Sequence, residues 1–255
     1  MNVCKNAAKA ALLLLLCAKV KAQNADDSTS FHQKLYNPFE TNLQVRSQYL
    51  WRGFTVSSSP ITDVDMHYKS KDGTWQAGFW GGASFTGDYK EFDYYVTYSK
   101  NNFGASIWDI NNFSNYPNVS LFDYDRRSTS HFIDVGVSYK IPMKLPLLAS
   151  WNTIVEGRDI YTKENGSVGN AYSNYVQLDQ TLWQQAGANL HVFVAGGFAF
   201  GHQQNFYGSK PNIVNSGLTY NKEIIIFKYH LPISATAMFS PEHKSGGLQL
   251  IANIF

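Results

Sequence analysis

Apolar and polar residues alternate along most of this chain, and this alternation limits its possible folds more than any other feature. Residues 63–69 illustrate the pattern, with apolar side chains at Val64, Met66 and Tyr68 and polar side chains between them. Successive side chains of a β-strand point to opposite faces of a sheet, so a period of two predicts strands with one apolar face. Because no helical period of useful length follows the N-terminal leader, the sequence predicts an all-β protein.

The predicted strands are unusually long. We count twelve, most of them 9 to 13 residues long, whereas strands of soluble proteins average about 5–6 residues. A tilted strand that crosses a lipid bilayer needs about 9–11 residues. The predicted strands cover residues 42–53, 61–70, 73–85, 91–100, 103–112, 129–140, 146–156, 171–182, 189–200, 217–229, 231–239 and 247–255.

The connections between these strands alternate in length. Long loops near 113–128, 157–170 and 201–216 alternate with short turns such as 71–73 and 101–102. Membrane-spanning barrels have short turns at one end and longer loops at the other. The sequence therefore predicts a transmembrane, antiparallel, up-and-down β-barrel of about twelve strands. A soluble, secreted, lipocalin-like barrel is the rival at the level of the fold.

The apolar face of each predicted strand would meet lipid. Only 16% of the residues are charged while 15% are aromatic, against about 25% charged in soluble domains. Tyr and Trp collect where a barrel crosses the membrane interface. We expect such an aromatic girdle from the residues near strand ends on the apolar face, namely Trp51, Tyr68, Trp75, Tyr98, Tyr139 and Trp151.

The polar faces would line a lumen. Side chains of both signs occur there, which predicts ion pairs that partly fill the interior. The expected constriction consists of Arg46, Arg52, Asp63, Asp65, His67, Asp93 and Asp179. Same-face neighbours on one strand lie about 6.5–7 Å apart, so Asp63, Asp65 and His67 alone would not close a metal shell. We therefore predict no metal and no cofactor.

The first 22 residues have the pattern of a secretory signal peptide. Basic residues precede a short apolar stretch at 10–18, and a small-residue cleavage pattern ends at Ala22. The expected domains are a cleaved leader at 1–22 and a single barrel at 23–255. Both cysteines lie in the leader, so the mature chain would have no disulfide framework.

The chain ends in Phe255. A C-terminal aromatic residue is typical of bacterial outer-membrane barrels, whose assembly machinery reads the last strand, so we expect that machinery as a partner. The face that contains Phe255, however, also contains Asn253 and Gln249, while the face of Ile254 is more apolar. The pattern leaves open which of the two faces points outward.

Several short motifs resemble those of one known family. Residues 47–53 (SQYLWRG), followed by Pro60, resemble the start of the TorF or Gcw_chp outer-membrane barrels. The segments 77–81 and 91–95, with Tyr98, are also similar to that family. Further likeness lies in Tyr116-Pro117 and in the turn at Ser240-Pro241-Glu242. The resemblance implies an outer-membrane β-barrel with a possible role in transport and carries no catalytic residues.

Motifs of the common enzyme classes are absent from the sequence, so we predict no enzymatic activity. A lipid hydrolase would need a histidine and a serine on the outer surface, and the candidates are His131 and His243. We expect an interfacial position for the first and a solvated loop for the second. Lys and Arg do not cluster in the sequence, so it does not predict nucleic-acid binding.

Together these features predict an outer-membrane β-barrel of a Gram-negative bacterium, in contact with outer-membrane lipid. Twelve strands lie between the filled interior of eight-stranded barrels and the open channel of sixteen-stranded ones. A narrow, porin-like channel for small polar solutes is the main functional hypothesis. The alternatives are a structural or adhesive barrel that acts through its loops and, last, an outer-membrane lipid hydrolase.

Overall fold

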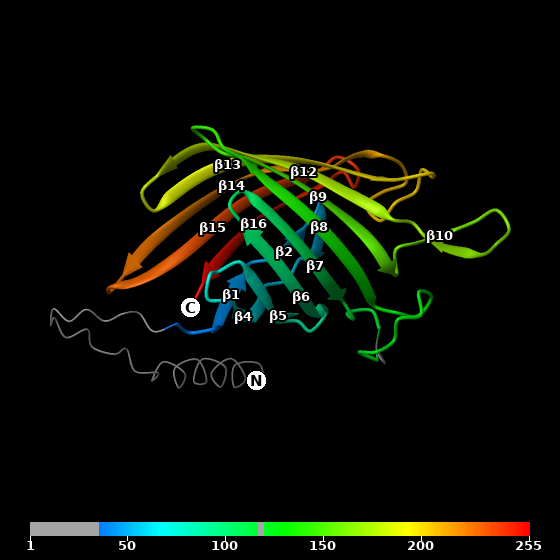
Figure 1. Ribbon diagram of the computed structural model, residues 1–255, viewed down its shortest axis with the longest axis horizontal. Helices are drawn as coiled ribbons and strands as arrows, with labels where there is room; N and C mark the ends of the chain where they lie inside the picture. Colours follow the sequence, from blue (N-terminus) through cyan, green and yellow to red (C-terminus); the bar gives the residue numbers. More distant parts are fainter. Residues whose placement is uncertain (1–35, 117–119) are drawn as a thin grey trace, which may run out of the picture. The chain divides into compact units, whose positions relative to one another are not determined.

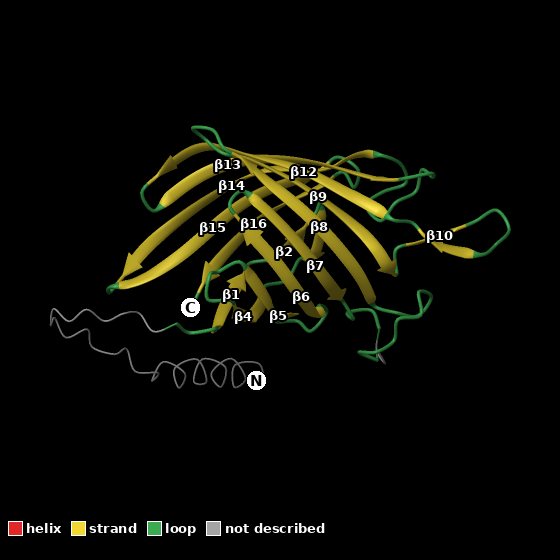
Figure 2. Cartoon of the chain, in the orientation of Figure 1, coloured by secondary structure: helices red, strands yellow, loops and turns green. Residues whose placement is uncertain are grey.

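The computed structural model describes residues 36–116 and 120–255. The predicted leader, 1–22, lies outside the described residues. Within the described ranges every regular element is a strand (Figure 2). No helix long and apolar enough to cross a bilayer occurs in this part of the chain.

Twelve strands form a closed antiparallel barrel in which each strand pairs with its neighbours along the chain (Figure 1). This confirms the predicted fold. The barrel strands are β1 (Phe39–Arg46), β4 (Ile61–Lys69), β5 (Trp75–Ser84), β6 (Lys90–Lys100), β7 (Phe103–Asn111), β8 (His131–Ile141), β9 (Leu147–Gly157), β12 (Ser173–Gln185), β13 (Ala188–Ala199), β14 (Asn212–Ile226), β15 (Tyr229–Ser240) and β16 (Ser245–Asn253).

The first and last strands close the barrel. In the register of β1 with β16, Gln44 pairs with Asn253 and Arg46 with Ile251. The amide of Leu43 also donates to the carbonyl of Phe255 at 2.9 Å. Closure joins the two edges of the sheet through a short register of three residue pairs. A barrel in lipid requires such closure because the bilayer core offers no hydrogen-bond partners.

The two ends of the barrel differ. Every connection at one end, which we call the turn end, has at most five residues, as at 70–74 and 101–102. The opposite end, the loop end, carries all of the longer connections, together with short ones at 85–89 and 241–244. One of the longer connections contains a small hairpin, β10 (Ile160–Thr162) with β11 (Val168–Asn170), which projects away from the barrel wall (Figure 1).

A second small hairpin follows β1. It comprises β2 (Tyr49–Trp51) and β3 (Phe54–Ser57) and forms a separate two-stranded sheet. The sequence predicted one wall strand over 42–53, and this was wrong beyond Arg46. Residues 49–57 form a hairpin of their own rather than more barrel wall.

The structure shows which face of the last strand points outward. Leu248 and Leu250 are strongly exposed, whereas Gln249 is buried. Asn253 lies opposite Gln44, whose neighbour Arg46 contributes to a cavity inside the barrel. The apolar face that leads to Ile254 is therefore the outer one, and β16 ends before the exposed Phe255.

Candidate functional site

The β2–β3 hairpin lies within the barrel. Its residues Trp51 and Phe54 pack against a core cluster of inward-facing residues from six wall strands and one loop, namely Ile110, Phe132, Ile154, Tyr175, Ala195, Tyr207 and Val214. Since these strands lie on different sides of the barrel wall, their convergence on one hairpin places it in the lumen. We call it the inserted hairpin.

The turn of the inserted hairpin depends on a glycine. Arg52 and Gly53 form the turn with φ angles of 45° and 89°. A Cβ atom on Gly53 would lie 2.1 Å from the carbonyl oxygen of Val214, so the hairpin tip touches the backbone of β14 directly. Glycine adopts positive φ at little cost and has no Cβ, so it meets both requirements.

Aromatic side chains hold the hairpin on one side. The ring of Trp51 lies 5.9 Å from that of Phe132 and 6.3 Å from those of Phe206 and Tyr207. Such ring pairs contribute beyond the area they bury. Trp51 was predicted on the outer aromatic girdle, and the structure places it inside the barrel instead, because the wall strand ends before it.

An ion pair holds the tip of the hairpin. The guanidinium of Arg52 donates to both carboxylate oxygens of Asp134 on β8, at 3.1 and 2.6 Å. It also donates to the hydroxyl of Tyr207 at 2.8 Å. Burial, the largest cause, raises the pKa of the Tyr207 hydroxyl, which is therefore neutral near pH 7.

A second ion pair lies between this hairpin and the turn end. Arg46 on β1 donates to Asp63 on β4 through Nε at 2.6 Å and Nη2 at 3.1 Å. The indole of Trp80 donates to the same carboxylate at 3.1 Å. Two-point pairing with a carboxylate fixes the orientation of an arginine, so Arg46 presents a fixed charge to the lumen.

Asp65 and His67 continue the polar face of β4 toward the turn end. The Nδ1 atom of His67 forms a short contact with Asp65, and the hydroxyl of Tyr95 donates to Asp65 at 2.7 Å. Glu40 lies 3.4 Å from Nε2 of His67. Among the described residues no group of three or more His, Cys, Asp or Glu side chains is placed to hold a metal ion.

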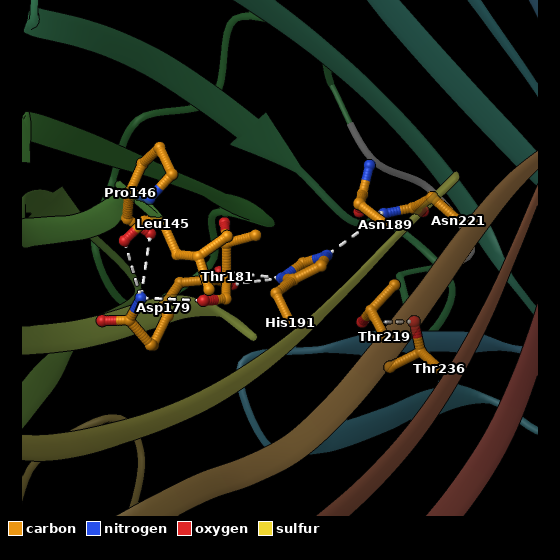
Figure 3. A network of polar contacts seen from close by, with 10 residues as sticks. Leu145, Pro146, Asp179, Thr181, Asn189, His191, Thr219, Asn221 and Thr236 are labelled. Carbon is orange, nitrogen blue, oxygen red and sulfur yellow. Dashed lines mark hydrogen bonds and ion pairs between the residues drawn. The ribbon is translucent and has the colours of Figure 1, made fainter. Parts of the chain in front are cut away.

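The remaining predicted lumen residues lie apart from each other. Asp93 is buried and accepts the backbone amide of Asn111 at 3.0 Å. Asp179 lies on the opposite wall, where it pairs with Nδ1 of His191 at 2.8 Å, and His191 leads on to Asn221 at 3.1 Å (Figure 3). Asp179 therefore belongs to a separate network of β12–β15.

Three cavities follow one another inside the barrel. The turn-end cavity, about 430 Å³, contains Arg46, Asp63, Asp65 and His67 in its lining. The middle cavity, about 180 Å³, is lined by Arg46, Arg52, Asp93 and Asp134, among others. The loop-end cavity of about 560 Å³ lies beneath the long loops.

Neighbouring cavities share walls. The middle cavity shares Arg46, Trp80 and Trp108 with the turn-end cavity. It shares Trp51, Glu91 and others with the loop-end cavity. Six of the seven predicted lumen residues line this series, and Asp179 does not appear in it. The middle cavity is the smallest, and the inserted hairpin supplies part of its wall.

The other predicted girdle aromatics lie on the barrel exterior. Tyr68, Trp75, Tyr139 and Trp151 are exposed although large and apolar. Tyr98 stacks edge-on against Trp75, with ring centroids 4.9 Å apart. The outer face between them carries exposed apolar side chains such as Met66, Phe79, Val96, Ile107, Val137, Leu178, Val194 and Leu218.

The two candidate histidines of a hydrolase lie in different surroundings. His131 is fully buried, with Nδ1 2.8 Å from Asp109 and its ring 4.7 Å from that of Tyr124. The hydroxyl of Tyr124 donates to Asp109 at 2.6 Å. His243 follows β15 and packs against Phe54, with ring centroids 4.7 Å apart.

Sequence reasoning missed the inserted hairpin and its partners Asp134 and Tyr207. One signal was present: Arg52-Gly53 breaks the alternation and is followed by Ser57-Ser58-Ser59-Pro60, a turn-forming cluster. Tyr207 gives no such signal, because it lies in a long loop whose path only the tertiary structure defines.

The chain thus forms a closed twelve-stranded barrel with an apolar exterior and a polar, partly filled interior, the construction of a membrane-spanning β-barrel. No family model and no curated protein matches the chain. One solved structure, described as "Unveiling the Mechanism Behind the in-meso Crystallization of Membrane Proteins", is 10% identical, with a TM-score of 0.47 over 84% of this chain and 82% of its own. Another, described as "Bacterial polysaccharide outer membrane secretin", is 12% identical, with a TM-score of 0.34 over 76% of this chain and 68% of its own. At these scores neither neighbour informs the function.

Proposed function

We propose that the barrel spans the outer membrane of a Gram-negative cell. The closed sheet and the exposed apolar exterior support this, because such a surface is costly in water and stable in lipid. In this proposal Tyr68, Trp75, Tyr98, Tyr139 and Trp151 lie at the lipid interface. Lipid is then the main partner, and the assembly machinery reads the last strand near Phe255.

The barrel acts in this proposal as a narrow channel for small polar solutes. The observation that carries it is the series of three cavities with shared walls, from the turn end to the loop end. Charged and hydrogen-bonding side chains line the series, as a hydrated path for polar solutes requires. A barrel filled only for stability would need no such series.

The inserted hairpin sets the width of the path. It narrows the lumen to the middle cavity of about 180 Å³, between the Arg46–Asp63 and Arg52–Asp134 pairs. A constriction lined by fixed charges of both signs admits small polar solutes and excludes bulky ones. The proposed role therefore differs from that of a wide, general porin.

Conductance across a planar bilayer tests this role, combined with swelling of liposomes in solutes of increasing size. The proposal predicts small, discrete conductance steps and swelling only with the smallest solutes. Protein that folds into the membrane yet gives neither signal would contradict it. Soluble, monomeric protein in the absence of detergent would contradict the membrane placement itself.

A structural or adhesive role is the second candidate, and one observation favours it. The loop between β7 and β8 presents Phe122 with 85% of its surface exposed, next to the exposed Leu121. Exposed apolar residues on a loop fit a contact surface for another molecule. Substitution of Phe122 by Ser would reduce cell adhesion if this role holds and would leave conductance unchanged.

Two further expectations stay proposals. We propose no enzymatic activity, which an assay for lipid hydrolysis by the purified barrel would test. Membership of the TorF-type barrels rests on the motifs quoted above, and the first of them, at 47–53, contains β2 and the Arg52-Gly53 turn of the inserted hairpin. The resemblance therefore concerns the segment that narrows the lumen.

A further inference from the structure

The loop-end cavity has the size and walls of a binding site for a small molecule. Its volume of about 560 Å³ lies within the range of about 300–1,000 Å³ that is usual for ligand pockets. Four aromatic side chains form an apolar part of the wall, namely Trp51, Phe54, Phe132 and Phe206. Asn112, Ser114 and Asn115 supply polar groups on another part.

A cation that forms no ion pair within 4 Å with any described residue faces this cavity. Arg158 follows β9 and lies over two aromatic rings, with its Cζ atom 5.1 Å from the centroid of Phe132 and 5.9 Å from that of Phe206. Its Nε atom is buried and has no hydrogen-bond partner among the described residues. No ion pair of Arg158 within 4 Å occurs in the same part of the chain.

An anion lines the same cavity. Glu91, at the start of β6, is buried and forms no ion pair with any described residue. Asp88 also lines the cavity, but the hydroxyls of Ser84 and Thr86 each donate to it at 2.5 Å. Asn112 hydrogen-bonds the Glu91 carboxyl group, and Arg158 attracts it without a contact within 4 Å. Glu91 and Arg158 are therefore opposite charges on one cavity wall that form no direct ion pair.

We propose that the loop-end cavity binds a small zwitterionic solute with an apolar group, the chemistry of amphipathic amino acids and short peptides. The carboxylate of the solute pairs with Arg158 and its ammonium group pairs with Glu91. The apolar group lies against the rings of Trp51, Phe54 and Phe132. This inference rests on the proposed channel and names the class of solute that enters it.

The two charges of the site explain why a zwitterion fits better than a simple ion. An anion alone would leave the buried Glu91 without a cationic contact and would approach it with like charge. A cation alone would do the same at Arg158. Leaving a buried charge unpaired is expensive, so only a solute with both charges satisfies both side chains.

The test is isothermal titration calorimetry on the full-length barrel in detergent with three related probes. The probes are L-phenylalanine, L-phenylalaninamide, which lacks the carboxylate, and 3-phenylpropionate, which lacks the ammonium group. We expect L-phenylalanine to bind at least about tenfold more tightly than either analogue, since each loses one charge-assisted contact. Equal binding of all three, or no binding of L-phenylalanine at millimolar concentration, would overturn the proposal.

Two substitutions assign the contacts. Arg158→Gln should abolish the preference for the free acid over the amide, and Glu91→Gln should abolish the preference for the amine over 3-phenylpropionate. Arg127→Gln and Glu164→Gln, both in exposed loops, are matched controls that should leave binding unchanged. If Arg158→Gln does not fold, Arg158→Lys serves instead and should retain part of the affinity.

Binding and conductance separate this inference from the channel itself. Conductance without selective binding of L-phenylalanine would refute the solute class and leave the channel intact. Selective binding without conductance would refute the channel and show that the cavity is a closed binding site. Equal effects of Arg127→Gln and Arg158→Gln on binding would refute the assignment of the carboxylate contact.

Discussion

Arg52 and Asp134, 82 residues apart in sequence, form a two-point ion pair in the interior of the barrel. The side chains are only 14% and 2% exposed. The pair connects the tip of the inserted hairpin to β8 and so holds in place the segment that narrows the lumen. The width of the proposed channel depends on that connection.

Substitution of Asp134 by Asn should loosen the inserted hairpin. It leaves the Arg52 guanidinium buried without its anion, which typically costs about 3–5 kcal/mol in the free energy of unfolding. We expect a lower midpoint of unfolding in urea and larger conductance steps, because the hairpin no longer occupies one position. Unchanged steps and midpoint would contradict this role.

The double variant Arg52→Gln with Asp134→Asn is the control for this first prediction. Removing both charges avoids the unpaired guanidinium, so part of the lost stability should return, in the manner of a double-mutant cycle. The conductance should nevertheless stay above that of the native chain, since the ion pair that positions the hairpin is absent from both variants.

The contact of Gly53 with β14 gives a second prediction. Gly53→Ala adds a Cβ atom that would lie 2.1 Å from the carbonyl of Val214, at a φ of +89°. Gly87→Ala is the matched control, because Gly87 has a φ of +79° but no atom within 4 Å of the added Cβ. Both substitutions carry the left-handed backbone cost of about 1–2 kcal/mol.

We expect Gly53→Ala to lower the stability well beyond that shared cost, since the clash displaces the hairpin tip. Urea unfolding followed by gel mobility measures the difference between the two variants. Equal losses at both positions would mean that the hairpin does not press on β14.

The membrane placement gives a third prediction, which compares neighbours on one strand. Leu218 on β14 is exposed on the outer face, whereas Thr219 points inward, where its hydroxyl lies 2.9 Å from that of Thr236. Leu218→Arg should lower the stability of the barrel in lipid by about 2–4 kcal/mol, the cost of an arginine near the midplane. Thr219→Arg should lower this stability less, because the charge of the new side chain reaches the hydrated lumen.

Refolding into lipid vesicles at graded urea concentrations measures both variants, and the same series in detergent shows whether the effect depends on the bilayer. A larger loss for Thr219→Arg than for Leu218→Arg in lipid would reverse the assignment of the faces.

The charges of the turn-end cavity give a fourth prediction. Glu40, Asp63 and Asp65 line it with Arg46 and His67, so acidic groups outnumber the permanently basic one. Asp65→Asn should reduce the preference for cations, seen as a shift in reversal potential under a salt gradient. Asp179→Asn removes the same charge from a residue that lines none of the three cavities, so it should leave the reversal potential in place.

Most of the barrel wall could be predicted from the sequence. Long segments of period two predicted the twelve wall strands, because a wall between lipid and a polar lumen imposes that period directly. β14 begins at Asn212, five residues earlier than predicted, because residues 212–216 lack a clear alternation of apolar and polar side chains. The faces of β16 needed the structure, because a pairing register decides them and the sequence alone does not contain it.

The interior was harder to predict. Arg52-Gly53 indicated a turn directly after Trp51, but nothing in the sequence showed that the hairpin around this turn folds into the lumen. Arg52 was expected in the lumen, but its partner Asp134 was not, because contacts across a barrel join residues far apart in sequence. The cavity at the loop end likewise forms from several loops whose paths are set by tertiary contacts.

Single-channel recording of the purified, refolded chain in a planar bilayer tests the central claim most directly. The account predicts small, discrete conductance steps for the native protein and larger steps for Asp134→Asn. Native protein that inserts and folds but conducts no ions, together with an Asp134→Asn variant that is equally silent, would contradict the claim that a path past the inserted hairpin crosses the barrel.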